Sequence, residues 1–101
     1  MAHELLGDSS EFPEGQMKGT TVGGKSLLVA RVEGKLYAMD GRCSHMSMDL
    51  SKGRIEGPLV TCKLHGAQFD IRTGEVVRNM AAKPMKSYQV VEEGGRAFVE
   101  I

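Results

Sequence analysis

The sequence predicts a single all-β domain, built either as a sandwich or as a small barrel. Short runs of strand-forming residues alternate with glycine-containing turns along the chain. No stretch shows a 3.6-residue apolar period over three helical turns. The length of 101 residues matches one domain. Together these observations favour antiparallel strands joined by tight turns.

The first part of the chain contains the clearest strand signals. Residues 26–32 are rich in strand formers, and Glu33-Gly34 turns the chain into residues 35–39. Two such runs around a two-residue turn predict an antiparallel hairpin. Residues 10–13 indicate at most one short helical turn.

The second half of the chain repeats this pattern with shorter strands. Turn residues at 57–58, 72–74 and 92–96 divide it. The segments between and after these turns are predicted strands, at residues 59–61, 69–71, 75–77, 88–91 and 97–101.

Residues 41–80 differ in composition from the segments on either side. They contain both cysteines, two of the three histidines and many glycines. We expect them to form an insertion on a β framework made by residues 1–40 and 81–101. Loops on such a rigid framework commonly hold functional sites.

Charge and composition exclude several classes of function. Thirteen basic and thirteen acidic residues give a formal net charge of zero, which disfavours general binding to nucleic acids. Residues 1–8 show neither the basic segment nor the apolar run that is typical of a signal peptide, and no apolar run approaches the length that spans a membrane. We therefore expect a cytoplasmic, monomeric protein that does not bind nucleic acids or membranes.

The cysteines and histidines form two short motifs that predict a metal site. Cys43-Ser-His45 is followed, after sixteen residues, by Cys62-Lys-Leu-His65. Two thiolates and two imidazoles suit zinc or an iron–sulfur cluster. Zinc sites more often group both cysteines in one loop and both histidines in another. A binuclear cluster explains the mixture if each loop gives its cysteine to one iron and its histidine to the other.

Several other residues have simpler interpretations. We expect His3, near the terminus, to be solvated, Tyr88 to lie in the core, and Asp70 to make a structural pair. Met46 and Met48 could surround exposed imidazoles where a partner docks, or could only pack the loops together. Six charged residues near the motifs could steer a partner, although a solvated surface of mixed sign is the favoured interpretation; they are Arg42, Asp49, Lys52, Arg54, Glu56 and Lys63.

The two motifs, with Gly66 and Phe69-Asp70 following, resemble the Rieske [2Fe–2S] domain. The resemblance implies that Cys43 and Cys62 bind the inner iron and that His45 and His65 bind the outer iron. It implies an antiparallel β-sandwich base with an inserted cluster-binding subdomain. Residues 84–90 resemble the proline loop of the family, which shields one side of the cluster, and the strand that follows it.

The sequence departs from the family pattern around the ligands. Ser44, Met46, Ser47 and Lys63-Leu64 replace residues that are common in the family. Met48 and Leu64 stand where high-potential members carry a disulfide, and Ala67 and Phe69 where those members carry Ser and Tyr hydroxyls. Without these hydrogen bonds, the resemblance implies a potential near the low end of the Rieske range of roughly −150 to +300 mV.

The resemblance implies an electron carrier rather than an enzyme. A Rieske-type ferredoxin accepts one electron from an NAD(P)H-dependent flavoprotein reductase and passes it to a terminal oxygenase, which commonly hydroxylates aromatic rings. The alternatives are a Rieske-like small subunit of a nitrite reductase and a zinc-stabilised interaction module. All four ligands are present, which favours a working cluster.

Overall fold

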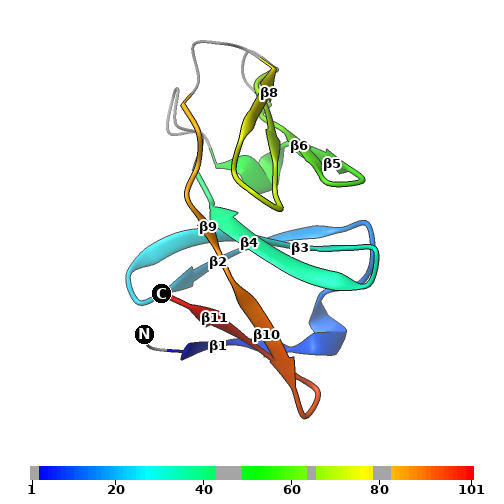
Figure 1. The fold of residues 1–101 in the computed structure, drawn as a ribbon, viewed down its shortest axis with the longest axis vertical. Coiled ribbons are helices and arrows are strands. Elements are labelled where there is room, and N and C mark those ends of the chain that lie inside the picture. The colour runs from blue at the N-terminus through cyan, green and yellow to red at the C-terminus, as the bar shows by residue number, and fades with distance from the viewer. Residues whose placement is uncertain (1–2, 43–48, 64–65, 79–82) are drawn as a thin grey trace.

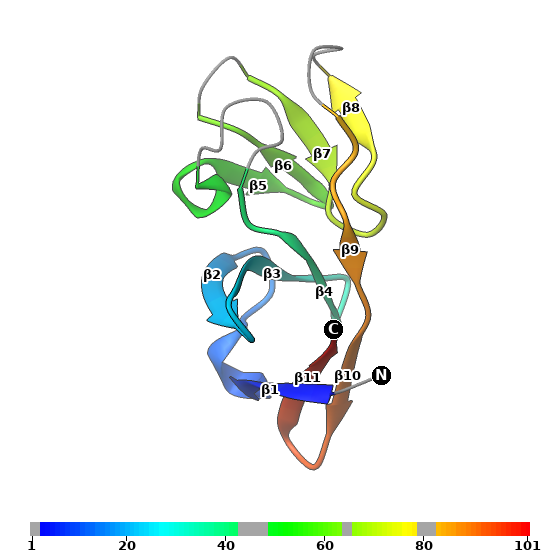
Figure 2. The same cartoon turned by 90° about the vertical axis from the view of Figure 1, so that its left-hand side faces the viewer.

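Antiparallel strands make up most of this protein. The computed structural model describes residues 3–42, 49–63, 66–78 and 83–101. Within these ranges the helical segments are two short 3-10 turns, η1 (Ser9–Glu11) and η2 (Leu50–Lys52). Neither has the length and hydropathy of a membrane span. Three sheets follow one another along the longest axis of the molecule (Figures 1 and 2). The prediction of an all-β fold is confirmed.

The first sheet brings the two ends of the chain together. Strand β1 (His3–Asp8) pairs with β11 (Arg96–Glu100), which pairs in turn with β10 (Val90–Glu93). The predicted terminal hairpin is therefore confirmed. Strand β1 was not predicted, because its pairing partner lies at the opposite end of the sequence and a bulge between Leu5 and Gly7 interrupts its register.

The second sheet lies in the middle of the molecule, in the order β2-β3-β4-β9. Its centre is the predicted hairpin of β3 (Lys25–Val32) and β4 (Lys35–Asp40). Glu33 and Gly34 both have positive φ, of 51° and 81°, as a type I′ hairpin turn requires. The outer strands are β2 (Met17–Val22) and β9 (Ser87–Tyr88).

The third sheet lies beyond the middle one. It consists of β5 (Arg54–Glu56), β6 (Leu59–Thr61), β7 (Gln68–Asp70) and β8 (Val76–Arg78), paired in chain order. All of these strands fall within residues 41–80. The division of the chain into a base and an inserted subdomain stays a prediction.

The middle sheet separates two apolar cores. Leu27 and Val29 of β3 face the core shared with the first sheet, whereas Leu28 and Ala30 face the core shared with the third. All four side chains are fully buried. A strand covered on both faces explains the continuous apolar run in this part of the sequence.

Arg31 ties the two sheets of the base together. Its guanidinium donates hydrogen bonds to the backbone oxygens of Phe12 (2.7 Å) and Ser9 (3.2 Å) and to the carboxylate of Glu92 on β10 (2.8 Å). The hydrogen bond from Arg31 lowers the pKa of the Glu92 carboxyl. The sandwich is therefore fixed by a polar clamp as well as by its core.

Candidate metal centre

The segment that contains the first motif is closed at its base by backbone pairing. Arg42 and Asp49 form an antiparallel bridge, and the Leu50 amide donates to the Gly41 carbonyl at 2.8 Å. Asp49 Oδ1 then accepts from the Ser51 hydroxyl (2.7 Å) and amide (3.0 Å), which lowers the pKa of Asp49 and starts η2. Cys43 and His45 lie between these ends and outside the described residues, as do Met46 and Met48.

The second motif occupies the connection between β6 and β7. Cys62 follows the last residue of β6, and its amide donates to the Ala67 carbonyl at 2.7 Å. Gly66 completes the reversal with a positive φ of 66°. The Cys62 side chain is buried within the core between the second and third sheets. His65 lies outside the described residues.

Close packing at Gly53 brings the end of η2 against the end of β6. A Cβ atom on Gly53 would collide with the carbonyl oxygen of Thr61, the residue before Cys62. Arg54, which follows Gly53, is the β-partner of Thr61. The residue that follows η2 therefore lies against the residue before Cys62, and only glycine allows so close an approach.

The segment that resembles the proline loop is attached to the third sheet. The Met85 amide donates to the Gly74 carbonyl at 2.7 Å, and a Cβ atom on Gly74 would collide with the Met85 carbonyl oxygen. Met85 is buried in the same core as Cys62, whereas Pro84 is exposed. The chain thus leads from the third sheet to β9 of the second sheet.

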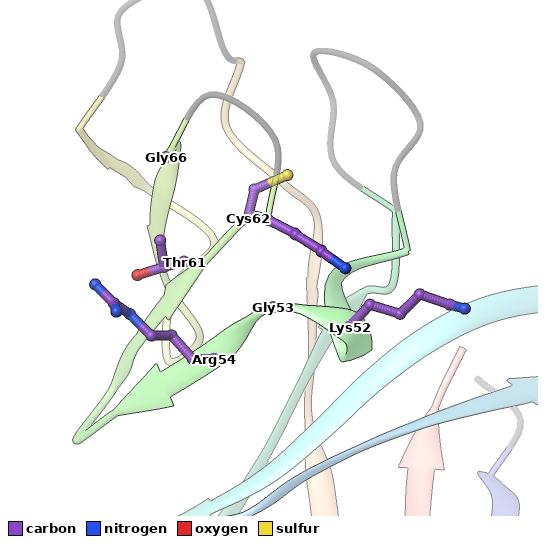
Figure 3. A pocket seen from close by; sticks show the side chains of 7 residues that line it. Lys52, Gly53, Arg54, Thr61, Cys62 and Gly66 are labelled. Atoms are coloured by element: carbon purple, nitrogen blue, oxygen red, sulfur yellow. The ribbon is translucent and has the colours of Figure 1, made fainter.

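A pocket of about 390 Å³ opens beside Cys62 (Figure 3). The described residues that line it come from η2, β5, β6 and the second motif: Lys52, Gly53, Arg54, Thr61, Cys62, Lys63 and Gly66. In Figure 3, Lys52 and Arg54 extend to opposite sides of Gly53, and the Cys62 sulfur lies at the end of β6. The sequence placed these cations near the motifs, but only the pairing of β5 with β6 brings them to one pocket.

This geometry agrees with a family match that spans most of the chain. The model of a family described as the Rieske [2Fe–2S] domain matches residues 3–89. The chain belongs to the Rieske [2Fe–2S] domain family. Its cofactor is accordingly one [2Fe–2S] cluster of the Rieske type.

Known Rieske proteins are similar to this chain in sequence and in structure. The ferredoxin component of a naphthalene 1,2-dioxygenase system from Pseudomonas aeruginosa is 38% identical over 91 residues, which are 90% of this chain and 88% of the relative. The ferredoxin of carbazole 1,9a-dioxygenase from Nocardioides aromaticivorans IC177 superposes with a TM-score of 0.92 at 26% identity, covering 98% of this chain and 97% of that one. A ferredoxin in complex with the reduced oxygenase of carbazole 1,9a-dioxygenase gives a TM-score of 0.88 at 26% identity, over 96% and 91% of the two chains.

The residues of this Rieske domain fit the cluster where the structure describes them. Cys62 supplies a soft sulfur donor on a loop closed by its own amide, among buried apolar side chains. Ala67 and Phe69 are both fully buried in the core that includes Cys62. Cys43, His45 and His65 lie outside the described residues, so the complete ligand set stays a prediction.

Three minor predictions about single residues are confirmed. His3 lies on β1 in the first sheet, half exposed, with Nε2 2.8 Å from Glu100 Oε1. Asp70 holds the Arg72 guanidinium at 2.8 Å, a hydrogen bond that lowers the pKa of Asp70. Tyr88 is buried in the core of the base.

Proposed function

We propose that this Rieske protein is a one-electron carrier between an NAD(P)H-dependent flavoprotein reductase and a terminal oxygenase that hydroxylates aromatic rings. The proposed ligands are Cys43 and Cys62 on one iron and His45 and His65 on the other. A cytoplasmic location, a monomeric state and brief contacts with each partner belong to the same proposal.

One observation carries this proposal: similarity to ferredoxin components extends over nearly the whole chain. The relative from Pseudomonas aeruginosa is the ferredoxin component of a naphthalene dioxygenase system. The carbazole system provides a ferredoxin of matching fold and a complex of ferredoxin with oxygenase. In such systems the ferredoxin supplies electrons, and the oxygenase performs the reaction on the substrate.

The protein's own contribution is to hold, shield and tune the cluster. The bound cluster takes up and releases a single electron. The backbone closures at Gly41–Leu50 and Cys62–Ala67 fix the ends of both ligand segments. Ala67 and Phe69 offer no hydroxyl to the cluster sulfurs, so we propose a potential near the low end of the Rieske range.

Spectroscopy of anaerobically purified protein tests the cofactor and its redox role. Absorption and low-temperature EPR spectra would be recorded before and after dithionite, with iron, sulfide and zinc assays. We expect a red-brown protein that bleaches on reduction and gives a rhombic signal with average g below 2. A colourless protein with zinc and no sulfide would show a metal-stabilised binding module instead.

Single substitutions test the four ligands. Changing Cys43, His45, Cys62 or His65 to alanine should abolish the Rieske absorption and EPR signals. His3→Ala serves as the matched control, because His3 lies in the first sheet and contacts Glu100. Retention of the unaltered spectrum in any of the four variants would remove that residue from the ligand set.

Gel filtration from the native host distinguishes a carrier from a permanent subunit. A carrier should elute at the size of its own chain, separate from the oxygenase and the reductase. Stable co-elution with a large partner would support the alternative of a Rieske-like subunit in a redox complex.

A further inference from the structure

The net charge of zero conceals opposite charges at the two ends of the molecule. Residues 41–85 contain seven Lys and Arg residues but four Asp and Glu residues, which gives a net charge of +3. The other residues contain six basic and nine acidic residues, which gives −3. Residues 41–85 include η2 and the third sheet, whereas the acidic remainder includes the first sheet at the opposite end (Figure 1).

Several acidic groups at the basic end are already engaged within the protein. The Asp49 carboxylate accepts from Ser51, and Asp70 pairs with Arg72 at 2.8 Å. Glu56 lies 3.5 Å from Arg54, but both side chains are more than 70% exposed (75% and 71%), so this pair neutralises Arg54 only weakly. Lys52, Arg54 and Lys63 at this end are all exposed to solvent.

Three of these cations belong to the lining of the pocket beside Cys62. Lys52, Arg54 and Lys63 line it, and none of the described lining residues is acidic. Thr61 and two glycines complete the lining, so hydroxyl and backbone groups lie next to the charges. Lys and Arg side chains make charge-assisted hydrogen bonds with carboxylates, so the lining suits acidic side chains from another protein surface.

We propose that this basic pocket docks an acidic surface of the flavoprotein that donates the electron, an inference that rests on the proposed function. An electron gained at this end lowers its net charge by one. Attraction to an acidic donor therefore weakens after transfer, which favours release of the reduced carrier. An acidic acceptor would instead bind more tightly once it had taken the electron, so the charge suits the donor.

The test compares two double variants with the same net charge. Lys52→Glu/Arg54→Glu reverses the pocket without touching either motif, and Lys35→Glu/Arg96→Glu makes the same change on exposed residues of the base. Association of each oxidised holoprotein would be measured by biolayer interferometry. The immobilised probe is the host flavoprotein, purified by its NAD(P)H-dependent reduction of the wild-type cluster.

Reversal at the pocket should slow association at least about tenfold at low ionic strength, with the difference disappearing in high salt. The control should change association by less than about twofold. The variant Lys52→Arg/Arg54→Lys, which keeps both charges, should associate at the wild-type rate. Absorption spectra of all variants establish that each carries the cluster.

Two results would overturn the docking proposal while the proposed function stands. One is an equal effect of the two charge-reversing variants on association with a flavoprotein that reduces the wild type. The other is slower association of the pocket variant with the oxygenase and not with the flavoprotein. Failure of the proposed function has a different signature, because no host flavoprotein would then reduce the wild-type cluster.

The charge asymmetry is also measurable without a partner. Near neutral pH the wild type should be retained on a cation-exchange resin in spite of its zero net charge. The pocket variant should lose this retention, and the control, with the same net charge, should keep more of it. Identical elution of the two variants would contradict an exposed basic surface at this end.

Discussion

At the scale of single residues, the proposed low potential depends on Ala67 and Phe69, which share a core with Cys62. Ala67 accepts the hydrogen bond from the Cys62 amide through its backbone, and Phe69 pairs with Val60 across the β6–β7 ladder. Both side chains are fully buried and apolar. A reduced cluster carries extra negative charge, which hydroxyl donors would stabilise and these residues cannot.

Ala67→Ser should therefore raise the midpoint potential. A hydrogen bond to a charged group contributes about 1.5–3 kcal/mol, and about 1.4 kcal/mol corresponds to 59 mV for one electron. We expect an increase of roughly 60–130 mV, measured by redox titration followed by absorption. Ala97→Ser, at an equally buried alanine in the other core, is the control and should leave the potential unchanged. Equal potentials for both variants and the wild type would contradict the low-potential argument.

Tyr88 contributes to stability through its protonated hydroxyl. The hydroxyl donates to Asp40 Oδ1 at 2.7 Å. Burial, and then this hydrogen bond, raise the pKa of Tyr88 from 10.0 to about 12. Because the folded pKa is the higher one, the stabilisation is complete below pH 10 and is lost as the pH rises toward 12.

Tyr88→Phe should lower the free energy of unfolding by about 1 kcal/mol near neutral pH. The difference from wild type should shrink between pH 10 and 12, where the folded-state tyrosine ionises. Urea denaturation of both proteins across this range measures it. Parallel stability curves would show that folding does not raise the pKa of Tyr88.

At the scale of elements, a glycine lets the segment before β9 pack directly against the third sheet. Gly74 has a φ of 82°, and its missing side chain leaves room for the Met85 carbonyl. Gly95, in the β10–β11 turn, has a φ of 79° but no atom within 4 Å of where its Cβ would lie. A comparison of Gly74 with Gly95 therefore distinguishes the cost of left-handed backbone strain from the cost of a steric collision.

Gly95→Ala should cost about 1–2 kcal/mol of stability, from left-handed strain alone. Gly74→Ala should cost roughly 3 kcal/mol, because a collision with Met85 and the loss of its hydrogen bond add to the same strain. Urea denaturation of the two holoproteins gives both values. Equal costs would mean that the contact between residues 74 and 85 contributes little.

At the scale of the whole molecule, the two cores predict unequal dependence on the cluster. The base has its own core and the Arg31 clamp, whereas the core below the third sheet includes Cys62 itself. Metal binding is coupled to the folding of the segments that provide the ligands. The base should therefore keep its structure when the cluster is lost.

Removal of the cluster with a chelator should accelerate hydrogen exchange of the Leu50 and Cys62 amides by at least roughly tenfold. The Glu100 amide, which donates to the Gln89 carbonyl in the base, should keep its protection. Exchange measured by NMR on oxidised holoprotein and apoprotein provides the comparison. A uniform loss of protection would indicate one cooperative unit that depends on the cluster throughout.

The sequence alone determined the features that rest on local chemistry. The Glu33-Gly34 turn and the alternation of short strands predicted the hairpins and the all-β class, because turn conformation depends on a few adjacent residues. The spacing of two cysteines and two histidines predicted the family and its cofactor, because a chelating loop needs its donors close together in sequence.

Only the tertiary structure decided the features that depend on distant pairing. Strands β1, β2 and β5 lack strong local signals and form because β11, β3 and β6 provide their hydrogen bonds. The same pairing brings Lys52 and Arg54 beside Cys62, and it separates the positive end of a neutral chain from the negative one. Composition records how many charges a chain has, whereas the fold determines where they meet.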